Sequence, residues 1–352
     1  MQGLEIVFIV ALAVANIGLS AWSFRHLPRE RWQMLAAVPL HKLDEGHWQG
    51  LNLTYYGLFN AIAFTAAAAL AFILGAAAGV PPVLMTAMLV VLIAVCVPTS
   101  RIVAFLVEKK RHTLTVGGAS FVGILLSPWL VWAAGWFSLR LGGPAVSVWP
   151  VLSAFSIAYA FGEGIGRLAC ISFGCCYGRP VDSLPPSWRG WMHAIAFRYA
   201  GATRKIAYAS GLEHEPVVPV QAFTNVLYLV AGTAGIILYL AGYYFSAFLL
   251  TLVVTQLWRV FSEFLRADYR GGGRFSAYQC MSGFSLLYAA CLPLVFPTGA
   301  LPPPDLQVGL AAIWTPLMLL ALQGLFVFAF LFTGRSEVTD SRITFHVVRD
   351  RV

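Results

Sequence analysis

Charged residues are scarce in this chain of 352 residues. Asp, Glu, Lys and Arg together make up 11% of it, whereas hydrophobic residues make up 59%. A soluble domain carries about 25% charged residues, so the composition excludes an ordinary soluble protein and indicates one that is embedded in a membrane bilayer. The formal net charge of +8 is typical of loops that face the cytoplasm and anionic lipid headgroups. No nucleic-acid partner is expected.

Signals of secretion and of disulfide scaffolds are also missing. Residues 1–5 lack the basic residues that open a secretory signal peptide, so the apolar run 6–22 is expected to remain as a membrane helix. The six cysteines mostly lie in or beside apolar segments, and their spacing does not indicate an extracellular disulfide framework. No internal repeat with a fixed period is present.

Long apolar stretches are what the chain does contain. Nine of them approach or exceed the length of about 20 residues that a helix needs to cross a bilayer, and short segments such as 79–82 and 301–304, with the Gly and Pro of turns, separate them. The sequence therefore predicts an all-α polytopic membrane protein. The stretches are 4–24, 52–79, 82–107, 118–141, 147–173, 219–241, 244–265, 277–297 and 308–333.

Basic residues alternate between the connections. They follow the first, third, fifth, seventh and ninth stretches, whereas the connections in between contain at most Arg140. The positive-inside rule then predicts an N-terminus outside and a C-terminus in the cytoplasm. The basic residues that follow the third and seventh stretches are Lys109, Lys110, Arg111, Arg266, Arg270 and Arg274.

The connection 174–218 has two readings. Its arginines either report topology, like those of the other basic connections, or serve function in a head that folds on the outer face. The segment contains several Pro and Trp residues and is not of low complexity, so we expect a small irregular cap that folds against the membrane.

Glu163 and Arg167 are two charged residues inside an apolar stretch. Their i,i+4 spacing places them on one helix face, where they can pair. One reading is a structural ion pair between helices. The other is that Arg167 binds a phosphate or carboxylate, because a guanidinium presents a fixed fork of donors to such oxyanions.

A second polar face lies on the stretch 244–265. Arg259, Glu263 and Arg266 are spaced i, i+4, i+7 and share one helix face. Arg259 and Glu263 lie deep enough to favour an internal cavity, since ionisable residues in membrane segments usually face one. Arg266 has the alternative reading of an end-of-helix residue that reaches toward the headgroups.

Three cysteines follow Arg167 closely. A zinc site typically has four ligands with Cys-x2-Cys or histidine spacings, and the Cys-x4-Cys-Cys pattern of Cys170, Cys175 and Cys176 does not match it, although His193 or His214 are available to complete a set. Membrane cysteines are usually small packing residues, and redox or nucleophilic chemistry is the alternative. We expect no metal and no cofactor.

Four segments together resemble one family. Residues 166–179 read GRLACISFGCCYGR, which is similar to the signature of bacterial prolipoprotein diacylglyceryl transferases, Gly-Arg-hydrophobic-Gly-Asn-Phe-hydrophobic-Asn-Gly-Glu-x-aromatic-Gly-Arg. GGASF at 117–121, PVQAF at 219–223 and RVFSEFLRAD at 259–268 resemble that family's Gly-Gly-x-Ser-Phe, Pro-Thr-Gln-Leu-Tyr and Arg-Phe-x-x-Glu-Phe-x-Arg-x-Asp segments. The resemblance covers roughly residues 115–280.

The resemblance implies an enzyme of the bacterial inner membrane with about seven to nine transmembrane helices around a lipid-binding cavity. Such an enzyme moves diacylglyceryl from phosphatidylglycerol to a cysteine thiol of a secreted lipoprotein precursor. The implied division of the chain has N-terminal transmembrane helices over 1–110, a transferase-like core over 111–280 with the cap 174–218, and C-terminal helices with a basic tail over 281–352.

Residue roles follow from the same resemblance. Arg167 is expected to hold the phosphatidylglycerol headgroup, and Arg259 and Glu263 to line the same cavity as catalytic residues. In the implied reaction a thiolate attacks the glycerol C3 carbon and glycerol phosphate leaves, while the arginines stabilise the charge on the departing phosphate. The lipid-binding positions are Gly166, Arg167, Gly174, Gln221 and Arg266.

Several positions depart from the family pattern. Val122 replaces the family's histidine, a candidate base for the thiol, and Val cannot accept a proton. Cys170, Phe173 and Cys175 replace two asparagines and a glutamate, which makes Cys170 and Cys175 candidates for a thiol role. A related thiol acceptor, a non-catalytic phospholipid-binding or lipid-translocating protein, and a thiol oxidoreductase are the other functions considered, and the resemblance argues against the last.

Overall fold

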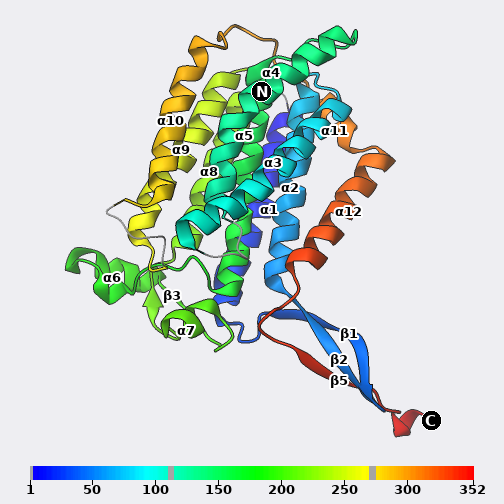
Figure 1. Ribbon diagram of the computed structural model, residues 1–352, viewed down its shortest axis with the longest axis vertical. Helices are drawn as coiled ribbons and strands as arrows, with labels where there is room; N and C mark the ends of the chain where they lie inside the picture. Colours follow the sequence, from blue (N-terminus) through cyan, green and yellow to red (C-terminus); the bar gives the residue numbers. More distant parts are fainter. Residues whose placement is uncertain (1–2, 110–114, 269–274) are drawn as a thin grey trace.

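The computed structural model describes residues 3–109, 115–268 and 275–352 and consists mainly of long helices (Figure 1). Lys110, Arg111, Arg270 and Arg274 lie outside the described residues. In the described part, eight helices are long and apolar enough to cross a membrane, so the predicted all-α polytopic fold is confirmed. They are α1 (Gly3–His26), α2 (Tyr55–Ala77), α3 (Pro82–Glu108), α4 (Val116–Arg140), α5 (Val148–Phe173), α8 (Val220–Leu240), α9 (Tyr244–Leu265) and α12 (Pro316–Thr333).

The eighth predicted stretch forms a shorter helix than expected. α10 (Ala277–Cys291) has 15 residues, fewer than the about 20 that span a bilayer. It begins with a capping box between Ser276 and Gln279 and passes at its end into the 3-10 turn η3 (Leu292–Leu294). α10 lies beside α9 and α4.

The ninth predicted stretch is divided into two helices. α11 (Leu306–Ile313) precedes α12, and the chain turns between them at Trp314 and Thr315. The Thr315 side chain caps α12, and Pro316 occupies a first-turn position where a helix has no use for a backbone N–H. These two residues define the start of the last spanning helix.

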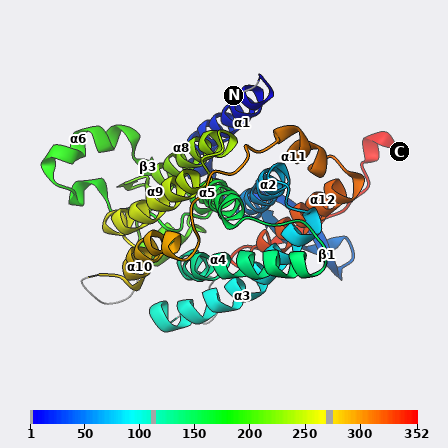
Figure 2. The same cartoon turned by 90° about the horizontal axis from the view of Figure 1, so that it is seen from above.

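α5 is the central helix of the bundle (Figure 2). Of its apolar segment, 78% is buried, more than for any other spanning helix of the described part, and α2, α8 and α9 pack around it. A Cβ added at Gly232 of α8 would lie 2.8 Å from the ring of Phe161, so a small residue is needed for this close helix contact. Polar side chains on α5 are therefore surrounded mainly by protein.

A small antiparallel sheet extends from one end of the bundle (Figure 1). It contains β1 (Met34–Asp44), β2 (His47–Thr54) and β5 (Ser341–Thr344) in the order β1-β2-β5. The all-α expectation included no strands here. β5 brings the C-terminal segment against the connection between α1 and α2, and Gly57 and Gly334 pack so closely there that a Cβ on Gly57 would lie 2.1 Å from the Gly334 Cα.

The cap 174–218 is a folded, mostly irregular unit at the same end of the bundle as this sheet (Figure 1). The strands β3 and β4 pair antiparallel, with Phe197 opposite Val217. Its elements are η2 (Val181–Ser183), α6 (Pro186–Ile195), β3 (Phe197–Arg198), α7 (Lys205–Ser210) and β4 (Pro216–Val217).

Arg204 fixes the cap to the ends of α1 and α5. Its side chain is fully buried, and its guanidinium donates hydrogen bonds to five backbone carbonyl oxygens, those of Ile171 and Ser172 on α5 among them. Burial lowers the pKa of Arg204 to about 10, so the group stays charged at neutral pH. The other three acceptors are the carbonyl oxygens of Leu27, Glu30 and Ala200.

Candidate functional site

A buried ion network joins α5 to α9. Arg167 and Glu163, one turn apart on α5, form an ion pair, and Nη2 of Arg259 on α9 lies 3.5 Å from the same Glu163 oxygen. The side chains of Arg167, Glu163 and Arg259 are 15%, 5% and 9% exposed. Two guanidinium groups therefore share one carboxylate, and the three groups together carry a net charge of +1.

α4 reaches this network through the segment 117–121. Nη1 of Arg259 donates a 3.0 Å hydrogen bond to the Ser120 hydroxyl, and Nη2 donates one of 2.8 Å to the Tyr159 hydroxyl. A Cβ at Gly117 would lie 2.5 Å from the Tyr278 ring and 3.2 Å from Nη1 of Arg259. Glycine at 117 therefore allows α4 to approach the arginine this closely.

Tyr159 and Ser120 received no role from the sequence analysis. Tyr159 lies four residues before Glu163, so the same spacing that joins Glu163 to Arg167 would have included it one turn earlier. Ser120 belongs to the segment 117–121, which was recognised as similar to the family's Gly-Gly-x-Ser-Phe. Its contact with Arg259 depends on how α4 and α9 pack, which residue spacing does not reveal.

Glu263 contacts Arg266, although it was expected to line one cavity together with Arg167 and Arg259. Its Oε1 lies 3.7 Å from Nη1 of Arg266, and Arg266 also donates two 2.8 Å hydrogen bonds to Asp268. The Arg266 side chain is 7% exposed, so protein groups hold it. Burial alone would lower the pKa of Arg266, but Cys176, Asp268 and Glu263 raise it above its usual value.

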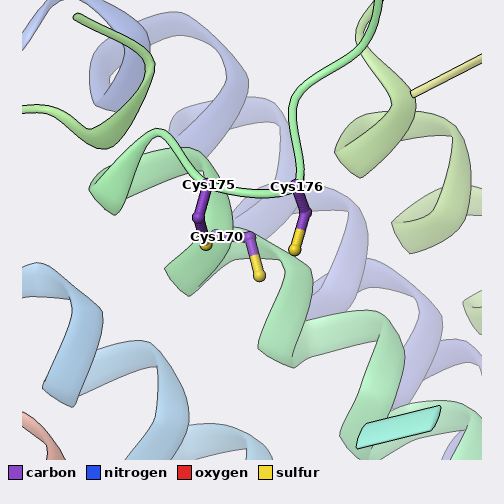
Figure 3. A group of neighbouring side chains, drawn as sticks. All are labelled: Cys170, Cys175 and Cys176. Atoms are coloured by element: carbon purple, nitrogen blue, oxygen red, sulfur yellow. The ribbon is translucent and has the colours of Figure 1, made fainter. Parts of the chain in front are cut away.

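Three cysteines come together at the end of α5 and in the loop that follows it (Figure 3). The sulfur atoms of Cys170, Cys175 and Cys176 all lie within 4.8 Å of one another. α5 ends at Gly174, which has a left-handed φ of 67°, and Cys176 has a φ of 56°, a conformation that is uncommon for any residue except glycine. These two backbone reversals turn the chain so that the thiols converge.

The thiols of this cysteine cluster differ in acidity. Hydrogen bonds from Cys170 and Cys175 lower the pKa of the Cys176 thiol well below its usual value, and the charges of Arg266 and Arg167 contribute less. All three cysteines were considered for thiol chemistry, and Cys170 and Cys175 were singled out because they replace polar residues of the family pattern. The position of Cys176 beside them depends on its left-handed backbone.

Neither histidine considered as a further ligand lies in the cluster. His193 contacts Asp182 at 3.0 Å, and His214 contacts Glu213 at 3.5 Å. Among the described residues, the group of possible metal donors at this place consists of the three cysteine sulfurs.

Gln221 holds the loop that carries the cysteines. It is buried in the first turn of α8, and its Nε2 donates a 2.8 Å hydrogen bond to the Cys175 carbonyl oxygen. Within the described residues its Oε1 has no hydrogen-bond partner, and neither does the buried hydroxyl of Tyr199. Gln221 therefore lies at the site, and its amide nitrogen holds the cysteine loop.

The two glycines predicted to bind lipid differ in their surroundings. A Cβ at Gly174 would lie 3.1 Å from Ile206 and 3.2 Å from Arg204, so this position is tight as well as left-handed. A Cβ at Gly166 would make only an ordinary contact of 3.9 Å with Ala63. Packing within the chain therefore requires glycine at 174 and does not require it at 166.

A hollow of about 780 Å³ opens beside the ends of α1 and α2. None of the predicted site residues lines it, so the predicted lipid-binding cavity around Arg167 remains a prediction. The hollow is basic and aromatic at its wall. It is lined by Trp22, Arg25, His26, Leu27, Arg29, Glu30 and Tyr55.

Comparison with known proteins agrees with this arrangement. The model of the prolipoprotein diacylglyceryl transferase family matches residues 47–295, which extends beyond the segment 115–280 that carries the motifs and covers α2 through α10. No curated protein matches the chain. The match spans more than half of the chain and includes the ion network and the cysteine cluster, and the chain therefore belongs to the prolipoprotein diacylglyceryl transferase family.

Proposed function

We propose that this protein transfers diacylglyceryl from phosphatidylglycerol, or a similar anionic phospholipid, to the cysteine thiol of a lipoprotein precursor or a related acceptor. Family membership supports transferase chemistry in a membrane. The observation that carries the proposal is that Arg167 and Arg259 both lie against the buried carboxylate of Glu163. An excess of positive charge in a poorly solvated place favours a phosphate group.

The arginines are suited to the departure of glycerol phosphate. The bond that breaks joins the glycerol C3 carbon to a phosphate oxygen, and negative charge grows on that oxygen as the bond breaks. Arg167 and Arg259 approach from different helices, so they can hold two phosphate oxygens at once. Donors that are already fixed in place stabilise such charge without reorganisation. Ser120 and Tyr159 keep Arg259 in position.

The incoming thiol needs to lose a proton, and the family's usual groups are replaced here. Val122 stands at the position of the family histidine. Thr224, at the position of a family glutamate, accepts a 2.8 Å hydrogen bond from Trp258 and donates one to the Val220 carbonyl. Activation of the thiol therefore has to come from another part of this site.

A direct assay tests the function. Purified protein is incubated with phosphatidylglycerol vesicles and a lipobox peptide that contains one cysteine, and mass spectrometry follows the peptide. We expect a thioether product whose mass is that of the peptide plus diacylglycerol minus one water, together with released glycerol phosphate. A peptide with serine in place of the cysteine is the matched control. Absence of product from wild-type protein and the cysteine peptide would contradict the transferase function for this acceptor.

Loss of the family histidine favours one other function, a phospholipid-binding or lipid-translocating protein without catalysis. In that case phosphatidylglycerol would co-purify with the protein and depend on Arg167, while no thioether product would form. Lipid extraction and mass spectrometry of wild-type and Arg167→Ala protein, done beside the peptide assay, separate the two functions.

We also propose a location in the bacterial inner membrane with the N-terminus outside and the C-terminus in the cytoplasm. Opposite sides require an odd number of crossings, so in this proposal α10 together with η3 crosses in addition to the eight long helices. Reporter fusions test it: a periplasmic reporter is expected to be active before α1, and a cytoplasmic one after β5. The positive-inside count includes Arg204 and Arg266, but both side chains are buried, so structural needs can explain their presence in these connections. The competing arrangement therefore places the cap 174–218 on the outer face. The opposite reporter pattern would establish that arrangement.

A further inference from the structure

The cysteine cluster is held from three sides. The Cys175 N–H donates to the Cys170 carbonyl oxygen at 3.1 Å, and Gln221 of α8 donates to the Cys175 carbonyl oxygen at 2.8 Å. Just after Cys176, the Arg179 N–H donates to the Leu265 carbonyl oxygen at the end of α9, at 2.9 Å. The three thiols therefore converge on a loop whose backbone two neighbouring helices fix, which is what a preorganised ligand set requires.

The sulfur positions suit a thiophilic metal ion with one position left open. Ligands placed tetrahedrally at about 2.3 Å from zinc lie about 3.8 Å apart. The three sulfur atoms already lie within 4.8 Å of one another, so small side-chain movements would bring them to that spacing. The described residues offer no fourth histidine, cysteine or carboxylate donor here. Three protein ligands with a fourth position for substrate are typical of catalytic rather than structural zinc.

The neighbouring charges are consistent with such a site. Three thiolates and one Zn²⁺ carry a net charge of −1, and a fourth thiolate would make it −2. Arg167 lies one turn before Cys170 on α5, and Arg266 is close enough to Cys176 for the two to influence each other electrostatically. Buried charge of this sign is tolerated only when opposite charge is close. Arg167 and Arg266 are the cations nearby, and Glu163 shares the first while Glu263 and Asp268 share the second.

We propose that Cys170, Cys175 and Cys176 bind a zinc ion whose fourth position takes the acceptor thiol, so that this site activates the nucleophile in place of the missing histidine. The inference rests on the proposed transferase function. It also accounts for the replacement of family polar residues by Cys170 and Cys175. Zinc suits this role because a thiol that coordinates it is deprotonated, and because zinc has no redox chemistry of its own.

The step balances without an oxidant. The acceptor thiol loses its proton on binding, and its sulfur then forms a bond to the glycerol C3 carbon of the phospholipid. The bond from that carbon to the phosphate oxygen breaks, and its electron pair leaves with glycerol phosphate, which the arginines receive. A proton equal to the one lost by the thiol is taken up by the leaving phosphate or by solvent. The thioether product is a weak ligand and leaves the site.

Metal content tests the site without reference to activity. Full-length protein is stripped with a chelator, incubated with zinc sulfate, separated from unbound metal and analysed by elemental mass spectrometry. We expect about one zinc per chain, and a roughly tenfold or greater loss of affinity in Cys170→Ser, Cys175→Ser and Cys176→Ser. Cys280→Ser changes an exposed cysteine on α10 and should bind zinc like the wild type. Size-exclusion profiles and thermal unfolding show that each variant is folded.

Cobalt(II) tests the open position. Its absorption bands report tetrahedral thiolate coordination, and we expect them to change when the cysteine lipobox peptide is added and to stay the same with the serine peptide. The proposal is overturned if the wild-type protein retains no zinc, or if the three cysteine variants bind as much zinc as Cys280→Ser. It is also overturned if the cobalt absorption bands do not change when the cysteine peptide is added.

Activity of the metal-free protein separates this inference from the proposed function. Thioether formation at the wild-type rate without zinc would overturn the zinc site and leave the transferase function intact. Zinc binding and a thiol response without any thioether product would support the site and contradict the transferase function. Restoration of product by added zinc would support both.

Discussion

Nη2 of Arg259 lies 3.5 Å from Oε1 of Glu163, the oxygen that also pairs with Arg167. The two arginines are 92 positions apart in the sequence, and one carboxylate on the central helix brings them together. Glu163 alone cannot neutralise both arginines, which is the basis of our proposal that the two guanidinium groups hold a phosphate. The predictions below test the role of Arg167 in the reaction, the packing that positions Arg259, and the contacts that hold the cap 174–218.

The first prediction concerns Arg167. Arg167→Ala should lower the rate of thioether formation by about 100-fold or more, because one preorganised donor to the departing phosphate is lost. The rate is measured with the peptide assay at saturating phosphatidylglycerol. Arg140→Ala is the matched control, since Arg140 is an exposed arginine at the other end of α4 from Ser120. Near-normal turnover of Arg167→Ala would contradict the assigned role.

The second prediction concerns the approach of α4 to Arg259. Gly117→Ala should reduce transfer by about tenfold, since its Cβ would meet the Tyr278 ring and displace Nη1 of Arg259, and small displacements of catalytic groups are costly. Gly123→Ala, on the same helix, would place its Cβ 3.5 Å from the Cys96 sulfur, an ordinary contact, and should stay within about twofold. Equal transfer rates for both variants would show that the contact of α4 with Arg259 does not affect the reaction.

Arg204 gives a prediction about stability. Arg204→Ala should lower the free energy of unfolding by more than about 3 kcal/mol, because five carbonyl oxygens, three of them in buried hydrogen bonds, lose a charged donor. Thermal unfolding and limited proteolysis of the cap 174–218 measure the effect. Arg198→Ala removes an exposed arginine of β3 that makes one hydrogen bond to the His214 carbonyl oxygen and should change stability little. A resistant cap in Arg204→Ala would contradict the anchoring role.

Two glycines with similar backbones allow a separate test of packing at Gly174. Gly174→Ala and Gly211→Ala both place a side chain at a left-handed φ, 67° and 64°, which costs about 1 kcal/mol. Only the alanine at 174 would also crowd Arg204 and Ile206. We therefore expect Gly174→Ala to lower the thermal midpoint more than Gly211→Ala. Identical shifts would mean that the crowding is relieved without cost.

Much of the fold was predictable because lipid leaves few alternatives. A long apolar run in a bilayer has to satisfy its own backbone, so it forms a helix, and the runs that became α1 to α5, α8 and α9 are long and uninterrupted. The boundary between α11 and α12 was missed because Thr315 and Pro316 read as part of one apolar run. The strand β5 was missed because it pairs with β2 over nearly 300 residues, which no local pattern contains. The hairpin of β1 and β2 is local, with two residues between the strands, and it was overlooked in the search for membrane helices.

The contacts of the candidate site were also predictable only in part from the sequence. The pairing of Glu163 with Arg167 follows from i,i+4 spacing on one helix, and the structure contains it. The contact of Arg259 with Glu163 rather than Glu263 depends on how α9 packs on α5, which one helix face cannot show. The convergence of Cys176 on Cys170 depends on a left-handed φ at a residue that seldom adopts it. Spacing located the site, and helix packing decided its contacts.

The pairing of β5 with β2 has a consequence for biosynthesis. β2 lies between β1 and β5, so one edge of it stays open until the last segment of the chain has left the ribosome. An open strand edge is a template for pairing with another chain. A chain that stops before residue 341 would keep its long helices but leave the β2 edge at His47–Gly50 without a partner. The C-terminal segment replaces that open edge with β5, an edge strand of four residues, which offers less backbone to another chain.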